Sequence, residues 1–364
     1  MPYDLNHLDT PFVSVDLDIV KQNITQLSQR ATAQGLKVRP HTKTHKQPFF
    51  AQLQWEAGAQ SLTVAKLDEA EIMLEAGFDN LLIAYPLMGD AKAHRLANLM
   101  ARGLKPTVSI DSLASMRTLM KAAAVSDRSI DVLVEVDTGF HRCGLTGTPV
   151  VELAQAIHDA PGLNMAGLMS FAGHISGKTD SSLIRQIIQD DDAQLGSYAA
   201  MLRQHHLPVG TLSVGGTTLS HNMQILEHAT EIRPGIYIFN DMGIVSGGSV
   251  DVSRCAARIW ATVVSRPSRD RAVLDAGSKM LSTDGPLAGS YGFIVEHPKW
   301  SIPRISEEHA VVVFEDSDGP DIGERISIIP NHICTVMNLQ QRVVGIRNNQ
   351  VVASLPILAR GGTR

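Results

Sequence analysis

Short runs of β-branched and other apolar residues alternate with amphipathic stretches from about residue 36 to residue 240. The runs are apolar enough for strands buried on both faces, and the stretches between them repeat apolar residues three and four positions apart, as helices do. Eight such runs predict an α/β fold, a parallel (β/α)8 TIM-type barrel, with an open doubly wound sheet as the alternative. The predicted strands are LKVRP, SLTVA, NLLIAY, KPTVSID, IDVLVEVD, MAGLMSF, TLSVG and TEIRPGIYIF.

The pattern changes beyond residue 245, where short strands such as HAVVVFED and QQRVVGIR are separated by Gly, Pro, Asn and Asp turns. Hardly any helical period remains there, which predicts a C-terminal all-β domain. The opening run PFVSVDLD is also extended and is a candidate to pair with this β-domain rather than with the barrel. We expect a barrel over residues 12–242 and a β-domain formed by residues 1–11 and 243–364.

Composition excludes several classes of function. A formal net charge of −5 and 19% charged residues argue against a nucleic-acid or membrane-surface protein. The N-terminus lacks a signal-peptide pattern, and no apolar run approaches the roughly 18 residues of a spanning helix. The three cysteines are odd in number and irregularly spaced, which is typical of a reducing compartment. We therefore expect a cytoplasmic protein with neither a nucleic-acid nor a membrane partner.

Candidate chemistry follows the first predicted strand. In a barrel, functional side chains lie at the C-terminal ends of strands, and PHTKTHK occupies that place after LKVRP. A lysine in a partly desolvated barrel mouth has its charged form disfavoured, as an imine-forming amine requires, so Lys43 is the candidate. The alternative is a solvated basic loop. Lys46, His41 and His45 have no assigned role.

Three later strand ends add to this picture. Arg142 follows the fifth strand and can donate forked hydrogen bonds to an anionic oxygen, or simply pair with a nearby carboxylate. The Gly-Gly-Thr turn at 215–217 and the amides beginning at Gly235 follow the seventh and eighth strands, the usual phosphate corner of a barrel. A lysine on one side and a phosphate site on the other is the layout of a pyridoxal phosphate (PLP) site.

A second motif, PNHICTVMN, lies in the predicted β-domain. His332 and Cys334 are two positions apart, which on an extended strand would put both side chains on one face, able to bind one metal ion. An imidazole and a thiolate favour Zn²⁺, with Mn²⁺ or Mg²⁺ as alternatives, and water or substrate would complete the shell. The alternative is that this spacing is incidental.

The runs PHTKTHK, DTGFHRCG, SVGGT, RPGIY and PNHICTVMN, in this order along essentially the whole chain, resemble the family of D-serine dehydratases and D-threonine aldolases. This family shares the barrel and β-domain architecture of alanine racemase, the fold type III of PLP enzymes. The resemblance implies that Lys43 forms the Schiff base and that Arg142 contacts the phenolic oxygen of PLP. It also implies that Phe171 lies against the cofactor, and His174 could reach the substrate or be a loop histidine bonded to backbone. The remaining implied cofactor-binding residues are Gly215, Gly216, Thr217, Gly235, Ile236 and Tyr237.

The resemblance implies a PLP- and divalent-metal-dependent lyase that acts on small β-hydroxy-D-amino acids such as D-serine or D-threonine, as a homodimer. The His-x-Cys pair resembles the dehydratase ligand set, whereas the aldolases carry His-x-Asp, which favours dehydration to a 2-oxo acid and ammonia. Retro-aldol cleavage to glycine and an aldehyde is the alternative. Further alternatives are an amino-acid racemase, with Tyr291 as a second acid/base, and a non-catalytic PLP carrier.

Overall fold

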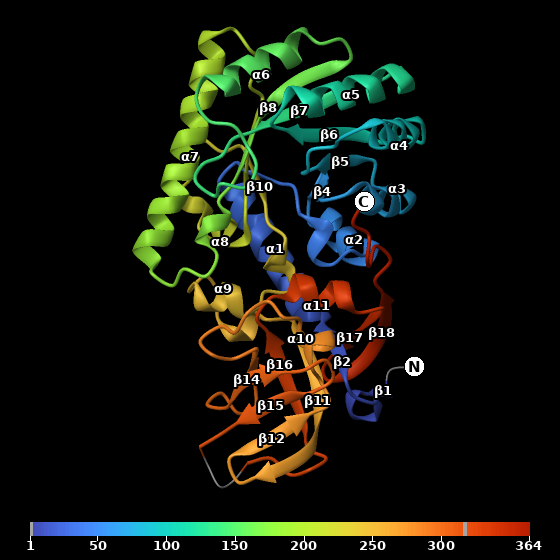
Figure 1. Cartoon of the computed structure of the whole chain (residues 1–364), viewed down its shortest axis with the longest axis vertical. Helices are drawn as coiled ribbons and strands as arrows, with labels where there is room; N and C mark the ends of the chain where they lie inside the picture. Colours follow the sequence, from blue (N-terminus) through green and yellow to red (C-terminus); the bar gives the residue numbers. More distant parts are fainter. Residues whose placement is uncertain (1–2, 316–318) are drawn as a thin grey trace. The chain divides into compact units, whose positions relative to one another are not determined.

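A computed structural model describes residues 3–315 and 319–364 of the chain (Figure 1). The chain divides into two compact units. Unit 1 comprises Met1–Thr25, Thr44–Gln47 and Ile236–Gly361, and unit 2 comprises Gln26–Lys43, Pro48–Gly235 and Gly362–Arg364. The domain bounds expected from the sequence stay a prediction.

Unit 2 contains a sheet of eight parallel strands in the order β3-β10-β9-β8-β7-β6-β5-β4. A parallel bridge between His41 and Thr63 joins the two ends of this order, and the Thr63 amide donates to the Pro40 carbonyl over 2.7 Å. The sheet therefore closes on itself, and the predicted (β/α)8 barrel is confirmed. The strands are β3 (Lys37–Val38), β4 (Leu62–Val64), β5 (Asn80–Ile83), β6 (Lys105–Ile110), β7 (Ile130–Glu135), β8 (Leu163–Phe171), β9 (Thr211–Gly215) and β10 (Glu231–Arg233).

The eighth strand is shorter than its pattern predicted. β10 ends at Arg233, because Pro234 has no amide N–H for the ladder. The chain then turns through the 3₁₀ segment η5 (Ile236–Ile238) instead of continuing as a strand over GIYIF.

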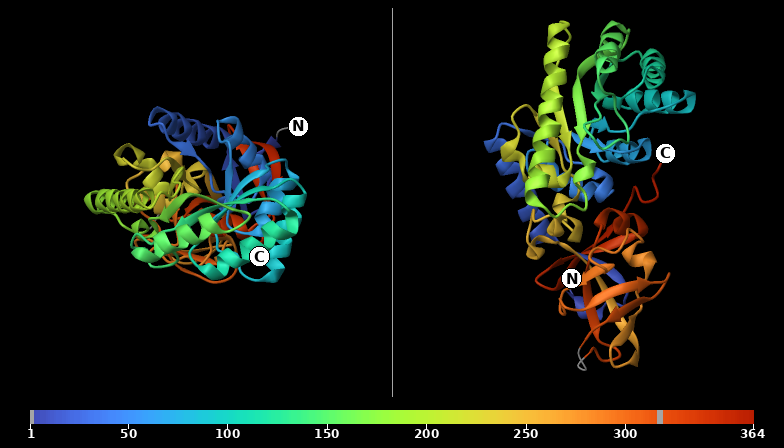
Figure 2. Two further views of the ribbon diagram at one scale, coloured as in Figure 1. Left: turned by 90° about the horizontal axis from the view of Figure 1, so that it is seen from above. Right: turned by 60° about the vertical axis from the view of Figure 1, so that its left-hand side comes forward.

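Helices follow the strands of unit 2, as the amphipathic stretches predicted. The helix α7 (Ser181–Gln204) packs on β8 and β9 and runs along the outside of the strands (Figure 2). The apolar stripe of α6 (Thr148–Asp159) repeats at three- and four-residue spacing and is buried; it consists of Val150, Leu153, Ala154 and Ile157. The other helices are α2 (Pro48–Glu56), α3 (Leu67–Glu75), α4 (Asp90–Ala101), α5 (Leu113–Ser126) and α8 (Thr217–His221), and α1 (Leu17–Ala33) carries the chain from unit 1 into unit 2.

Unit 1 is built around a mostly antiparallel sheet that has ten strands within the described part of the chain. The opening run forms β2 (Phe12–Asp16), which pairs antiparallel with β11 (Ala257–Ser268) and parallel with β17 (Arg342–Arg347). The interpretation that this run pairs with the C-terminal strands is therefore confirmed. The other strands are β1 (Tyr3–Asp4), β12 (Arg271–Leu274), β13 (Gly292–Ile294), β14 (Ser301–Ile305), β15 (Ala310–Val313), β16 (Arg325–Pro330) and β18 (Gln350–Pro356).

The mostly antiparallel sheet of unit 1 confirms the predicted β-domain, and short helices accompany this sheet. They are α9 (Met242–Ser246), α10 (Ser278–Leu281) and α11 (Ile333–Leu339). Cys143, Cys255 and Cys334 are all free thiols. Nowhere in residues 3–315 and 319–364 does a helix have both the length and the apolarity needed to cross a membrane.

Candidate functional site

Lys43 lies in a 3₁₀ turn (Thr42–Thr44) that follows β3 at its C-terminal end. The turn is tied to β4, because the Thr42 hydroxyl donates to the Thr63 carbonyl over 3.2 Å, and His41 Nδ1 accepts from the Lys43 amide over 3.4 Å. The half-buried Lys43 side chain places Nζ 5.6 Å from the centre of the Phe171 ring. The lysine predicted from the sequence therefore meets the aromatic residue at the end of β8.

Arg142 approaches the same aromatic ring from the loop after β7. Its guanidinium carbon is 4.8 Å from the centre of the Phe171 ring and 5.1 Å from that of Phe140. The loop folds back tightly at Gly144, which has a φ of +107° and where a Cβ would lie 2.5 Å from the Asp137 amide nitrogen. Only glycine fits this turn, and the turn keeps Arg142 near the strand ends.

His174 lies in the 3₁₀ segment η3 (Gly173–Ile175), directly after β8. Its ring lies beside Gly139, where a Cβ would be 3.6 Å from the imidazole. His174 Nδ1 is buried and has no hydrogen-bond partner within the described residues. A buried polar atom without a partner is costly, so this nitrogen is placed as if to bond a ligand.

The glycines predicted to hold a phosphate follow β9. Gly216 has a φ of +121° and precedes α8, and Thr217, the first residue of this helix, accepts the Gly235 amide on its hydroxyl over 3.3 Å. The strand ends of β9 and β10 are thus tied together at Thr217. Ile236 and Tyr237 begin η5 of unit 1, where Tyr237 is 2% exposed.

The residues at these strand ends fit the PLP group that the resemblance implies. Gly215 is packed so closely that a Cβ would lie 2.8 Å from Arg233 Nη2 and 2.9 Å from Phe171 Cδ2, so only a glycine leaves room there. Lys43, Arg142 and Phe171 supply an amine, a fork of donors and an aromatic face. His174, whose Nδ1 has no partner among the described residues, lies three residues after Phe171, the last residue of β8.

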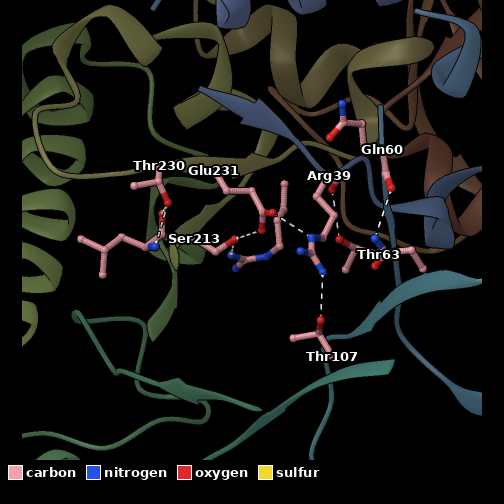
Figure 3. A network of polar contacts seen from close by, with 10 residues as sticks. Arg39, Gln60, Thr63, Thr107, Ser213, Thr230 and Glu231 are labelled. Atoms are coloured by element: carbon pink, nitrogen blue, oxygen red, sulfur yellow. Dashed lines mark hydrogen bonds and ion pairs between the residues drawn. The ribbon is translucent and has the colours of Figure 1, made fainter. Parts of the chain in front are cut away.

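Sequence analysis missed a set of charged residues inside the barrel (Figure 3). Arg39 and Glu231 form an ion pair at 2.8 Å, and the fully buried Arg233 donates to Ser213 Oγ and to the Ser170 carbonyl, each over 2.6 Å. Burial lowers the pKa of Arg233 to about 10. In the strand TEIRPGIYIF the alternation of charged and apolar residues was a signal that one side of β10 is polar.

Glu135 is another buried charged residue that sequence analysis missed. It ends β7 and is 5% exposed. Burial raises the pKa of its carboxyl, while the positive charges of Arg233 and Arg142 act in the opposite direction. The barrel interior beneath Arg142 is thus polar rather than purely apolar.

The sequence predicted that the metal motif of unit 1 would be an extended strand, and this prediction is wrong. β16 ends at Pro330, and α11 begins at Ile333 because the buried Asp241 carboxylate accepts the Ile333 amide over 3.0 Å. Asp241 is 1% exposed, and burial raises its pKa to about 6. His332 therefore lies at the helix N-cap, with Cys334 in the first turn of α11.

The turn nevertheless brings His332 and Cys334 together. A hydrogen bond to Cys334 is the main reason that the pKa of His332 is raised to about 9, and Asp241 and Asp284 act in the same direction. Asp284 contacts His332 Nδ1 at 2.5 Å. A carboxylate on one ring nitrogen of a histidine is the arrangement that orients metal-ligating histidines.

The donor set fits a metal ion held by two side chains only. No group of three or more His, Cys, Asp and Glu residues among residues 3–315 and 319–364 is placed to hold a metal ion. A cation at His332 and Cys334 would therefore take its remaining ligands from water or substrate. The Thr44 hydroxyl, one residue after Lys43 in the chain, is 3.2 Å from Cys334 Sγ.

The comparisons with known proteins cover both units. Residues 15–242 match the family described as alanine racemase, N-terminal domain, and residues 256–346 match the putative serine dehydratase domain. The chain is 31% identical to a D-threonine aldolase from Arthrobacter sp., over 99% of this chain and 95% of that one. A crystal structure of D-threonine aldolase from Filomicrobium marinum has a TM-score of 0.90 at 33% identity, over 98% of this chain and 97% of that one.

The chain is also similar to a dehydratase. It is 29% identical to the D-threo-3-hydroxyaspartate dehydratase of Delftia sp. strain HT23, over 90% of this chain and 91% of that one. The solved structure of that enzyme has a TM-score of 0.89 and covers 97% of this chain and 98% of its own. Structures of D-threo-3-hydroxyaspartate dehydratase also exist with a histidine or, two positions later, a cysteine replaced by alanine, the cysteine variant in a metal-free form. This chain therefore belongs to the alanine racemase-like family of PLP-dependent enzymes, and within it to the lyases.

Proposed function

We propose that the chain is a PLP- and divalent-metal-dependent lyase that removes water from β-hydroxy-D-amino acids of the D-serine or D-threonine type, giving a 2-oxo acid and ammonia. The observation that carries the choice of dehydration is the His-x-Cys pair at the start of α11, His332 at the N-cap and Cys334 in the first turn, with Asp284 bonded to the histidine. In the D-threo-3-hydroxyaspartate dehydratase, a histidine and a cysteine with the same His-x-Cys spacing are each replaced by alanine in one variant, and the structure of the cysteine variant is metal-free. Zn²⁺ is the metal that this donor pair favours, ahead of Mn²⁺ or Mg²⁺.

The residues of unit 2 divide the work of holding the cofactor and moving protons. Lys43 would hold PLP covalently and, once displaced by the substrate amine, take the proton from Cα. Arg142 would bind the phenolic oxygen, and Phe171 would lie against the ring. Bound there, PLP supplies an electron sink for the charge that develops at Cα, and the metal supplies a Lewis acid for the β-hydroxyl.

The phosphate would be held at the ends of β9 and β10. Gly215 and Gly216 allow the close approach of backbone, the Thr217 hydroxyl and the first amides of α8 are donors, and Gly235 with the amides of Ile236 and Tyr237 would complete the set. His174, with its unpartnered Nδ1, would bond the substrate carboxylate or hydroxyl.

Retro-aldol cleavage to glycine and an aldehyde is the second candidate. The identity of 31% to a D-threonine aldolase supports it. In that reaction the same residues would hold the cofactor, but the proton would leave the β-hydroxyl and the Cα–Cβ bond would break. The homodimer and the cytoplasmic location expected from the sequence stay predictions.

Reductive trapping tests the placement of the cofactor. Borohydride treatment of the purified yellow protein should fix PLP on Lys43, and Lys43→Ala should abolish the adduct. Lys46→Ala is the matched control, since Lys46 lies in the same PHTKTHK run, and it should keep the adduct. Peptide mapping that finds the label on Lys46 would show the placement to be wrong.

Chelation tests the metal. Removing divalent cations should abolish lyase activity while the yellow colour remains, because the proposed metal and cofactor ligands are different residues. Zn²⁺ added back should restore activity in the unmodified protein and not in Cys334→Ala. Full turnover after exhaustive chelation would rule out the metal role.

A further inference from the structure

A hydrogen-bond network links Arg39 to Arg233 through Glu231 and Ser213. Figure 3 shows Arg39, Glu231 and Ser213 of this network. Arg39 Nε donates to Glu231 Oε2 over 2.8 Å, and Ser213 Oγ donates to Glu231 Oε1 over 2.5 Å. Arg233 Nη1 in turn donates to Ser213 Oγ over 2.6 Å. Ser213, Glu231 and Arg233 are 0%, 2% and 4% exposed, so these bonds are hardly weakened by water.

Strand register explains why these side chains meet. Glu231 and Arg233 are two positions apart on β10 and therefore point to the same side of the sheet. On the neighbouring β9, Ser213 pairs with Glu231 and Gly215 pairs with Arg233. The serine supplies the short bridge between the two charges, and the glycine leaves the space that the guanidinium fills.

The chemistry of the three side chains fixes which group donates and which accepts in each hydrogen bond of this network. The Glu231 carboxylate can only accept, so the single proton of the Ser213 hydroxyl is committed to Glu231. The Ser213 oxygen is then free to accept from Arg233. Loss of the Ser213 hydroxyl leaves Nη1 of the buried Arg233 guanidinium without its acceptor, which costs more than an ordinary hydrogen bond. Loss of the Glu231 carboxylate removes the acceptor that orients the Ser213 hydroxyl.

The Arg233 end of this hydrogen-bond network lies beside residues proposed to bind the cofactor. Arg233 Nη2 donates to the Ser170 carbonyl over 2.6 Å, one residue before Phe171. A Cβ on Gly215 would lie 2.8 Å from the same nitrogen and 2.9 Å from Phe171 Cδ2. The guanidinium is thus held against the ends of β8 and β9, where the PLP ring and phosphate are proposed to bind.

We propose that Ser213 and Glu231 are positioning residues that fix the guanidinium of Arg233 beside the PLP site, so that the cofactor binds against a positive charge of set position. Neither residue is proposed to touch the cofactor. Arg39 pairs with the other carboxylate oxygen of Glu231, Oε2, over 2.8 Å. The inference rests on the proposed PLP site but not on which lyase reaction the protein performs.

Replacement of Ser213 by alanine isolates this role, because it removes one hydroxyl without changing charge. Ser109→Ala is a matched control: Ser109 lies on β6 of the same barrel, is 0% exposed, and its hydroxyl has no hydrogen-bond partner among the described residues. Apo-protein is titrated with PLP, and the dissociation constant, the visible absorption band and the melting temperature are recorded. Ser213→Ala should weaken PLP binding by about tenfold and shift the band, whereas Ser109→Ala should match the unmodified protein.

Glu231→Gln provides a second variant, since it keeps the size of the side chain but removes the charge. It should change the affinity and the absorption band in the same direction as Ser213→Ala. A Ser213→Ala protein with unchanged PLP affinity and spectrum would overturn the proposal, and so would equal losses in Ser213→Ala and Ser109→Ala. Lack of lyase activity in an unmodified protein that binds PLP would refute the proposed function but not the role of Ser213 and Glu231.

Discussion

Asp192 offers a sharp test of how α7 supports the strand that carries Arg233. The Asp192 carboxylate is 1% exposed and accepts three successive backbone amides of the loop that leads into β10. Oδ2 accepts from Glu227 over 2.7 Å and from His228 over 3.0 Å, and Oδ1 accepts from Ala229 over 2.8 Å. Replacing Asp192 by asparagine keeps the shape of the side chain but turns one acceptor into a donor.

The expected cost follows from these three bonds. The amide group can accept at the Oδ2 position but then directs its NH₂ at the Ala229 amide, so one buried charge-assisted bond, worth about 1.5–3 kcal/mol, is lost. The other two bonds become neutral and weaken. Together these changes predict that the loop opens at a free-energy cost about 3 kcal/mol lower than in the unmodified protein, which corresponds to hydrogen exchange roughly 100-fold faster at 227–229.

Hydrogen exchange measured by mass spectrometry on the peptide containing residues 227–229 checks this value. Asp190→Asn is the control, because Asp190 is an exposed residue of the same helix and accepts from the Gln186 side chain over 2.8 Å. Exchange in the control should stay within about threefold of the unmodified protein, since exposed substitutions change stability little. Equal exchange rates at 227–229 in Asp192→Asn and Asp190→Asn would refute the reasoning.

Two further substitutions test the sites directly. Gly215→Ala should weaken PLP binding by about tenfold or more, because its Cβ would collide with Arg233 Nη2 and Phe171. A PLP titration that gives unchanged affinity would contradict the proposed phosphate site at the ends of β9 and β10. Asp284→Asn should lower metal affinity by about tenfold in a competition assay with a chelator, because His332 Nδ1 loses the carboxylate that orients it. If metal affinity does not change, Asp284 does not orient a ligand.

The strand exits could be predicted from the sequence because parallel strands in a barrel end at one rim. Lys43, Arg142 and Phe171 are far apart in the chain, yet Phe171 ends a recognised strand and the other two lie in the segments after recognised strands. The structure brings Lys43 and Arg142 to the ring of Phe171. Local patterns were sufficient there. The turn at Gly144 and the close packing at Gly215 also agree with what short glycine motifs indicate.

Contacts between distant segments could not be predicted in this way. The bond from Arg39 to Glu231 joins residues 192 positions apart, and no local pattern shows that a charged pair will be buried within a barrel. The start of α11 has the same origin, since the carboxylate that accepts the Ile333 amide is that of Asp241, 92 positions away. The sequence therefore identified the His332 and Cys334 pair, but it predicted that the pair lies on an extended strand. In the structure the pair lies at the start of α11 instead.

Product analysis tests the central claim most directly. The holoenzyme with Zn²⁺ is incubated separately with D-serine and D-threonine, and 2-oxo acid, ammonia, glycine and aldehyde are all quantified. The account predicts pyruvate from D-serine or 2-oxobutyrate from D-threonine, each with an equal amount of ammonia. Glycine with acetaldehyde from D-threonine, without 2-oxobutyrate, would contradict dehydration and establish aldol cleavage instead.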